Sequence, residues 1–129
     1  MEVRGLTFDT GALIALERGV RIMKVRMEAA RRDGLVITVP SVVLTEWWRA
    51  APKQSRILET LDVEPVTERI AKLAGEAIAA VDATIVDAIV MASAAQRGDI
   101  VYTSDFEDLD RLHIHFSSVH KVLRVSTHL

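Results

Sequence analysis

The sequence predicts a single α/β domain in which two helical layers enclose a central, mainly parallel sheet of four to five short strands. Short apolar, β-branched segments alternate with helical patterns along the whole chain, as in proteins built around a parallel sheet. The length of 129 residues suits one domain, and half of the residues are hydrophobic, which is enough for a packed core. There is no cysteine, so disulfides and thiolate metal sites are excluded. We therefore treat residues 1–129 as one unit.

The first part of the chain predicts a strand, two helices and a second strand. Residues 3–9 form an apolar segment typical of a buried strand, and Thr10 is expected to cap a short helix that ends near Gly19. Residues 20–34 predict an amphipathic helix with a glycine stop. Its expected apolar face consists of Ile22, Val25 and Ala29. Residues 35–39 are β-branched and predict the second strand.

The rest of the chain continues the alternation. A helix is expected from Ser41 to Arg49, and Pro52 should end it. The later elements, in chain order, are a helix near 53–61, a strand at 62–66, a helix capped by Thr67, a helix from Thr84 to Gly98, a strand at 99–104, an acidic helix to about Leu112 and a strand at 121–126.

The net charge of −2 conceals an asymmetry between the two parts of the chain. Residues 18–56 carry nine Lys and Arg against three acids, and residues 57–129 carry six against twelve. A basic surface beside an acidic one is compatible with a polyanionic partner. No apolar run has the length of a signal peptide or a membrane span, so we expect a soluble intracellular protein.

Four acids stand where a ligand site is expected. Ligands of open α/β sheets bind at the carboxyl ends of the strands. Asp9 ends the first predicted strand and Asp105 the fourth, while Asp87 lies in an otherwise apolar helix and Glu46 follows the second strand. A hard divalent cation such as Mg²⁺, which prefers oxygen ligands, explains all four together.

Each acid also has an ordinary structural interpretation. Thr84 and Asp87 have the spacing of a capping box, and Glu46 has the commonest fate of a helical glutamate, exposure to solvent. The acids of residues 105–110 favour the first turn of a helix, with Ser104 as its cap. These interpretations are compatible with a metal site, because a capping position also places a carboxylate at the edge of the sheet.

The segments around these acids resemble the four motifs of the PIN-domain nucleases, most closely the VapC-type toxins of type II toxin–antitoxin pairs. The segments are, in order, FDTGALIALERG, VPSVVLTE, DAIVMASAAQRG and VYTSDFEDL. The resemblance extends over residues 3–125 and implies a PIN-like three-layer α/β/α fold. The double tryptophan after Glu46 is outside the motifs.

The resemblance implies a metal-dependent endoribonuclease that hydrolyses phosphodiester bonds. Its catalytic and metal-binding acids would be Asp9, Glu46, Asp87 and Asp105, with one or two Mg²⁺ or Mn²⁺ ions as cofactors. Within this set we expect Asp9 and Asp87 as the most direct ligands and Glu46 as the residue that orients the attacking water. Secondary support is expected from Thr10, Thr103 and Asp108. Asp82 offers a rival register for the third acid.

The resemblance also implies partners: an RNA substrate, a VapB-type antitoxin and a second copy of the chain, all in the cytoplasm. The expected RNA contacts are Arg21, Lys24, Arg31, Arg49, Lys53 and Arg56. The alternative is that these residues form ordinary solvated helix faces. Apolar residues within 22–30 and 42–51 offer surface for a dimer.

Two other functions remain open from the residues alone. One is a catalytically inactive PIN-like binding module. The other is a receiver-like Mg²⁺-binding signalling domain, which the unpaired Asp9 and the absence of an acid after the third strand disfavour. The pair His113 and His115 lacks a third ligand and is interpreted as structural or exposed.

Overall fold

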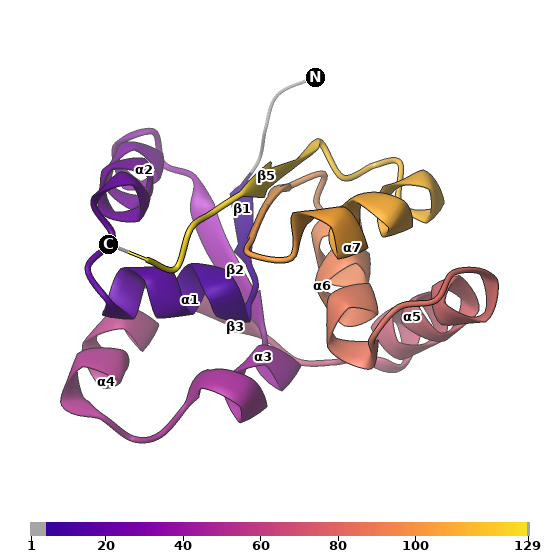
Figure 1. Ribbon diagram of the computed structural model, residues 1–129, viewed down its shortest axis with the longest axis horizontal. Coiled ribbons are helices and arrows are strands. Elements are labelled where there is room, and N and C mark those ends of the chain that lie inside the picture. Colours follow the sequence, from indigo (N-terminus) through magenta and orange to yellow (C-terminus); the bar gives the residue numbers. More distant parts are fainter. Residues whose placement is uncertain (1–4, 129) are drawn as a thin grey trace.

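The computed structural model describes residues 5–128, which fold around one parallel five-stranded sheet (Figure 1). The strands lie in the order β3-β2-β1-β4-β5, and every neighbouring pair is parallel. Their bounds are β1 Gly5–Phe8, β2 Val36–Pro40, β3 Asp62–Glu64, β4 Ile100–Thr103 and β5 Lys121–Arg124. The prediction of a short-stranded parallel sheet is confirmed.

Seven α-helices and a short 3₁₀ segment in the described residues complete the fold. The helices are α1 Thr10–Glu17, α2 Arg21–Arg32, α3 Ser41–Trp47, α4 Pro52–Leu58, α5 Glu68–Ala80, α6 Ile85–Ala95 and α7 Phe106–Leu112; the 3₁₀ segment is His113–His115. Figure 1 shows α1, α2 and α4 on one side of the sheet and α5, α6 and α7 on the other, with α3 following β2. This is the three-layer arrangement that the sequence predicts.

The helix α6 is the centre of its layer, and its sequence explains why. The hydroxyl of Thr84 accepts a hydrogen bond of 3.1 Å from the backbone N–H of Asp87, so the helix begins where the capping pattern predicts. Every residue from Asp87 to Ala94 is buried. The small side chains among them let the helix approach the sheet closely, which places Asp87 beside the strand ends.

The cap of α1 differs from the prediction. Asp9, not Thr10, is the N-cap, because its side chain accepts a hydrogen bond from the backbone N–H of Ala12. Ser104 likewise does not cap α7: Asp105 occupies that position and makes no side-chain capping bond. Both differences place an aspartate, rather than a hydroxyl residue, at the end of a strand.

The prediction of the apolar face of α2 is wrong. Met23 and Ala30 are the buried residues of this helix, whereas Ile22 is 49% and Val25 47% exposed. The sequence carries two overlapping apolar stripes, and packing against the rest of the domain selects the one through Met23. This leaves aliphatic side chains on the surface of α2.

The connection between α3 and α4 also differs from the prediction. The helix α3 ends at Trp47, and Pro52 begins α4 rather than ending α3, as its missing N–H allows at a first helical position. The side chain of Gln54, only 2% exposed, accepts hydrogen bonds from the N–H groups of Arg49 (2.8 Å) and Ala51 (3.3 Å). A buried amide therefore holds this loop in place.

Trp47 and Trp48 have different environments. Trp47 is 3% exposed, and its indole N–H donates a hydrogen bond of 2.9 Å to Glu17. Trp48 is partly buried and packs against the core from outside. The first tryptophan therefore belongs to the core, and the second contributes to the surface.

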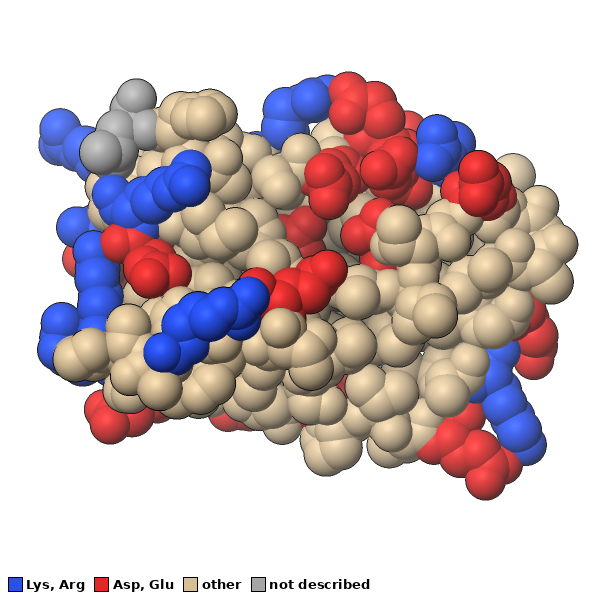
Figure 2. Space-filling view, turned by 60° about the horizontal axis from the view of Figure 1, so that its bottom comes forward, with Lys and Arg blue, Asp and Glu red and all other residues tan. Residues whose placement is uncertain are grey.

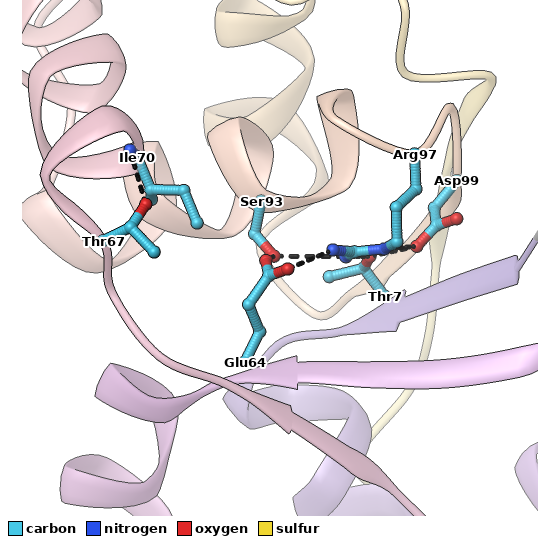
Figure 3. Close-up of polar contacts among 7 residues, drawn as sticks. All are labelled: Thr7, Glu64, Thr67, Ile70, Ser93, Arg97 and Asp99. Atoms are coloured by element: carbon cyan, nitrogen blue, oxygen red, sulfur yellow. Dashed lines mark hydrogen bonds and ion pairs between the residues drawn. The ribbon is translucent and has the colours of Figure 1, made fainter.

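A polar network centred on Arg97, which the sequence did not reveal, joins α6 to the sheet (Figure 3). The guanidinium contacts Glu64 at 2.8 Å and Asp99 at 2.9 Å. It also donates hydrogen bonds of 3.1 Å to the hydroxyls of Thr7 and Ser93. Within residues 5–128, the buried Oδ1 of Asp99 has no hydrogen-bond partner. The network ties β1, β3 and the start of β4 to the end of α6.

The described residues contain no helix that is both long and apolar enough to pass through a bilayer.

Candidate active site

The strand order creates a crevice between β1 and β4. The chain proceeds from β1 outward through β2 to β3, and then returns to place β4 on the other side of β1. In open parallel sheets, ligands bind at such a reversal, beyond the carboxyl ends of the strands. Asp9 follows β1 and Asp105 follows β4, so both lie at this point.

All four predicted acids line one cavity of about 300 Å³ at this edge. They come from separate parts of the chain: the end of β1, α3, the first turn of α6 and the end of β4. The full lining is Asp9, Thr10, Glu46, Thr84, Ile85, Val86, Asp87, Asp105 and Asp108. In Figure 2, acidic side chains surround a hollow in the middle of the visible face.

Asp9 is the most enclosed of the acids, with 4% of its surface exposed. One carboxylate oxygen accepts the N–H of Ala12 at 2.9 Å, and the other accepts the hydroxyl hydrogen of Thr103. Burial raises the pKa of Asp9 to about 6, and the charges of Asp105 and Asp87 add to this; the two hydrogen bonds act in the opposite direction. The carboxylate is thus oriented but poorly solvated.

Asp87 is 7% exposed and belongs to the first turn of α6. Burial raises its pKa to about 6, while hydrogen bonding to Thr84 lowers it. The charges of Asp105, Asp108 and Glu46 contribute to the same rise in pKa. The capping and metal-binding interpretations of this residue are therefore compatible in the structure.

Glu46 and Asp105 stand at the open side of the cavity, and both are exposed. Thr10 donates a hydrogen bond of 2.5 Å to Glu46, which joins the first turn of α1 to α3. The backbone N–H of Asp105 donates to Thr103 at 2.8 Å. The two predicted threonines, Thr10 and Thr103, therefore each contact at least one of the acids.

Asp108 lines the cavity as a fifth acid, and the guanidinium of Arg111 contacts its carboxylate at 2.8 Å. Asp82 does not line it; the residue is exposed, and only its backbone carbonyl contacts Arg111, at 3.4 Å. Of the two candidates for the third acid, Asp82 and Asp87, only Asp87 lines the cavity, so the geometry supports Asp87.

A glycine lets the first and fourth motifs approach each other. A Cβ atom on Gly11 would lie 2.5 Å from the Cβ and 3.0 Å from the backbone nitrogen of Ser104. Real side chains do not pack this closely, so only glycine permits the first turn of α1 to rest on the residue before Asp105. This contact brings Asp9 and Asp105 to the same crevice.

The donor set of the cavity fits a hard cation. Five carboxylates surround it, and among the residues described no Lys or Arg side chain lines it. Burial and mutual repulsion raise two of the pKa values, which is the situation that a bound divalent cation relieves. In residues 5–128 no three acids or histidines lie close enough together to form a ready-made ligand group. The acids line the cavity without forming a closed ligand group.

The six basic residues predicted to contact RNA are all exposed, and the structure brings only some of them together. Lys24 of α2 lies with Lys53 and Arg56 of α4 along a shallow groove of about 270 Å³. Arg21, Arg31 and Arg49 do not line that groove. Lys and Arg side chains gather mainly on the side of α2, at the left of Figure 2.

The histidine pair does not form a metal site. The ring nitrogen Nε2 of His113 lies 2.8 Å from the carbonyl oxygen of Val119, and His115 is exposed. The interpretation of these residues as structural or exposed agrees with their positions.

Two apolar residues of the cavity, Ile85 and Val86, were not predicted from the sequence. They stand beside Thr84 and Asp87 in the first turn of α6. Their position next to a predicted acid was the available signal, but an aliphatic residue in a helix is normally assigned to the core.

The sheet and its two helical layers have a PIN-like α/β/α fold, with an acid-lined crevice at the carboxyl edge of the sheet. No protein-family model matches the chain, and no curated protein sequence does. Several solved structures share the fold. One of them is a toxin–antitoxin complex from Klebsiella pneumoniae, with 20% identity, a TM-score of 0.70 and coverage of 96% of this chain and 98% of that one.

Another is VapBC2 from Rickettsia felis, bound to a DNA fragment from its promoter. It has 12% identity, a TM-score of 0.74 and coverage of 94% of this chain and 98% of that one. At these identities the likeness establishes a shared fold over nearly the whole length of both chains, as the sequence motifs predict.

Proposed function

We propose that this protein is a Mg²⁺-dependent endoribonuclease and the toxin of a type II toxin–antitoxin pair. The observation that carries the proposal is the convergence of Asp9, Glu46, Asp87 and Asp105 on one cavity at the carboxyl edge of the sheet. These acids are far apart in the sequence. Local structure accounts for the position of each acid separately, but not for their convergence on one cavity. A common ligand accounts for their meeting.

In this proposal the four acids hold one or two Mg²⁺ or Mn²⁺ ions. The metal supplies Lewis-acid stabilisation of a phosphoryl oxygen and a water activated as nucleophile. Thr103 and the N–H of Ala12 orient the carboxylate of Asp9, and Thr10 orients Glu46. We assign to Glu46, which lines the cavity and is exposed, the acceptance of a proton from the attacking water.

The toxin role rests on the shared fold with proteins from toxin–antitoxin complexes. By analogy, the chain would act in the cytoplasm, pair with a VapB-type antitoxin and form a homodimer. The exposed aliphatic residues Ile22 and Val25 and the partly buried Trp48 are candidates for such protein contacts. RNA would reach the cavity along the basic side of the molecule.

A receiver-like signalling domain does not fit the topology. Receiver domains of the flavodoxin type have the strand order 2-1-3-4-5, whereas this sheet has the order 3-2-1-4-5. An inactive PIN-like module remains as the alternative, and only activity distinguishes it.

The decisive experiment is cleavage of total RNA by the purified protein, with Mg²⁺ or Mn²⁺ and with a chelator. We expect cleavage only with the metal, and a loss of more than about 100-fold in Asp9→Asn and Asp87→Asn, since even indirect ligand support is worth about 10–100-fold. Asp110→Asn is the matched control, because this exposed acid of α7 does not line the cavity. RNA binding without cleavage under every metal condition would favour the inactive module.

The toxin role has its own test. Induced expression of the chain should arrest growth of a bacterial host, and Asp9→Asn should not. Co-expression of a small DNA-binding protein encoded beside the gene should restore growth. Arrest that persists in Asp9→Asn would separate toxicity from the proposed chemistry.

A further inference from the structure

Ile85 is an exposed aliphatic residue at the mouth of the acid-lined cavity. It is the first residue of α6, and 65% of its surface is exposed. Among large hydrophobic residues in the described chain, only Ile114, at 81%, is more exposed. An isolated exposed isoleucine is not unusual. What is unusual about Ile85 is its position beside the carboxylates.

The cavity meets the end of α6 rather than one of its sides. The consecutive residues Thr84, Ile85, Val86 and Asp87 all line it. Asp87 is buried and Ile85 exposed, as expected for residues two apart on a helix, which point in different directions. Asp87 and Ile85 therefore contribute a carboxylate and an exposed aliphatic side chain to the same cavity.

Apolar side chains are scarce in the lining of the cavity. Five of the nine lining residues are acids, two are threonines, and the remaining two are Ile85 and the partly buried Val86. No aromatic ring is among them, so a nucleobase cannot stack there in the usual way. Ile85 is the more exposed of the two aliphatic side chains available to a base beside the scissile phosphate.

We infer that Ile85 contacts the nucleobase next to the scissile phosphate and thereby positions single-stranded RNA for cleavage. This inference rests on the proposed nuclease function. The contact requires an unstacked base, because bases in a duplex present their faces only to one another. Ile85 is thus a substrate-contact residue, outside the metal-binding set.

The test is a cycle of protein and RNA changes. Wild type and Ile85→Ala are compared on a labelled single-stranded RNA that the wild type cleaves. The same RNA is also prepared with an abasic nucleotide on either side of the cleaved bond. Each change alone should lower kcat/KM by about tenfold, the size expected for one apolar contact. Both together should lower it no further, because they remove the same interaction.

Three controls separate this contact from structural effects. Ile85→Leu should retain most of the activity, since it keeps an aliphatic side chain. Ile114→Ala, at a still more exposed residue that does not line the cavity, should leave kcat/KM unchanged. Mn²⁺ affinity, measured by calorimetry, should be the same in wild type and Ile85→Ala, which places any defect in RNA contact rather than metal binding.

The inference is overturned if Ile85→Ala changes kcat/KM by less than about twofold, or if its effect multiplies with that of each abasic substitution. Unchanged kinetics with weakened self-association on size-exclusion chromatography would assign Ile85 to a protein interface instead. If the wild type cleaves no RNA with any metal, the nuclease proposal itself fails, and the inference with it.

Discussion

Thr103 donates its hydroxyl hydrogen to the carboxylate of Asp9, across 94 positions of sequence. The same hydroxyl oxygen accepts the backbone N–H of Asp105 at 2.8 Å. Because Thr103 ends β4 and Asp9 follows β1, this pair of bonds joins two predicted acids of the cavity through a single side chain. The effect of removing the Thr103 hydroxyl on the site can be measured.

Thr103→Val should weaken metal binding about tenfold, the usual cost of losing a residue that orients a ligand. The hydrogen bond from Thr103 lowers the pKa of Asp9, so removing it raises that pKa above about 6 and protonates more of the carboxylate near neutral pH. The acidic limb of the pH–rate profile should move to higher pH. Calorimetry with Mn²⁺ and rates as a function of pH provide the measurement.

The control for this substitution is Thr45→Val, because within residues 5–128 the hydroxyl of the exposed Thr45 bonds only the Val42 carbonyl of its own helix. A metal affinity within about twofold of wild type in Thr103→Val would show that Thr103 does not support the site.

The metal-free protein should lose stability as the pH rises from about 4 to 6. Asp9 and Asp87 have pKa values of about 6 in the folded protein, whereas an unfolded Asp titrates near 3.9. The folded state therefore binds more protons in this window, and the free energy of unfolding falls as the pH rises, by roughly 2–3 kcal/mol for each group. Urea denaturation in a chelator at several pH values measures the effect.

Asp87→Asn isolates one of the two contributions. The variant should match wild type near pH 4 and be roughly 2 kcal/mol more stable near pH 7, because the amide carries no charge to desolvate. The exposed Asp110→Asn should follow the wild-type curve. A stability difference between Asp87→Asn and wild type that is the same at every pH would contradict the assignment.

Magnesium should stabilise the folded protein. A ligand that binds only the folded state adds about 2.7 kcal/mol at a hundredfold excess over its Kd. Wild type and Asp110→Asn should show this gain in thermal unfolding, and Asp9→Asn and Glu46→Gln should show much less. An equal gain in Asp9→Asn would place the binding of the ion outside the cavity.

Arg97→Ala should destabilise the protein by about 3 kcal/mol, because it leaves the 1%-exposed Asp99 without its charged partner. Lys72→Ala removes an ion pair between largely exposed groups, Lys72 and Glu68, and should cost less than about 0.5 kcal/mol. Chemical denaturation compares the two variants.

The residues of the Arg97 network do not line the acid cavity. RNA cleavage per folded molecule should therefore be unchanged in Arg97→Ala below its melting temperature. A specific loss of activity in fully folded Arg97→Ala would connect the network to the site.

Much of the site was predictable because its signals are local. The strands are short apolar runs in the sequence. Thr84 stands directly before its helix, in the position of an N-cap, and Asp9 and Asp105 each follow a strand. Ligand sites of parallel sheets lie at the carboxyl ends of strands. The identity of the four acids, and their place at the end or beginning of an element, therefore followed from sequence.

Other features depend on contacts between distant segments. The exposure of Ile22, the start of α4 at Pro52 and the Arg97 network were not predicted, because each is decided by packing partners that the local pattern does not contain. A helix with two apolar stripes buries the one that its neighbours cover.

By itself, the sequence determined the order of helices and strands, the parallel α/β class and the four acids to which we assign the proposed chemistry. Only the tertiary structure decided that β4 lies beside β1, that the acids share one cavity and that Ile85 stands at its mouth. The physical reason is range: propensity, capping and periodicity act within a few residues, whereas strand order and convergence of charges depend on which distant surfaces pack together.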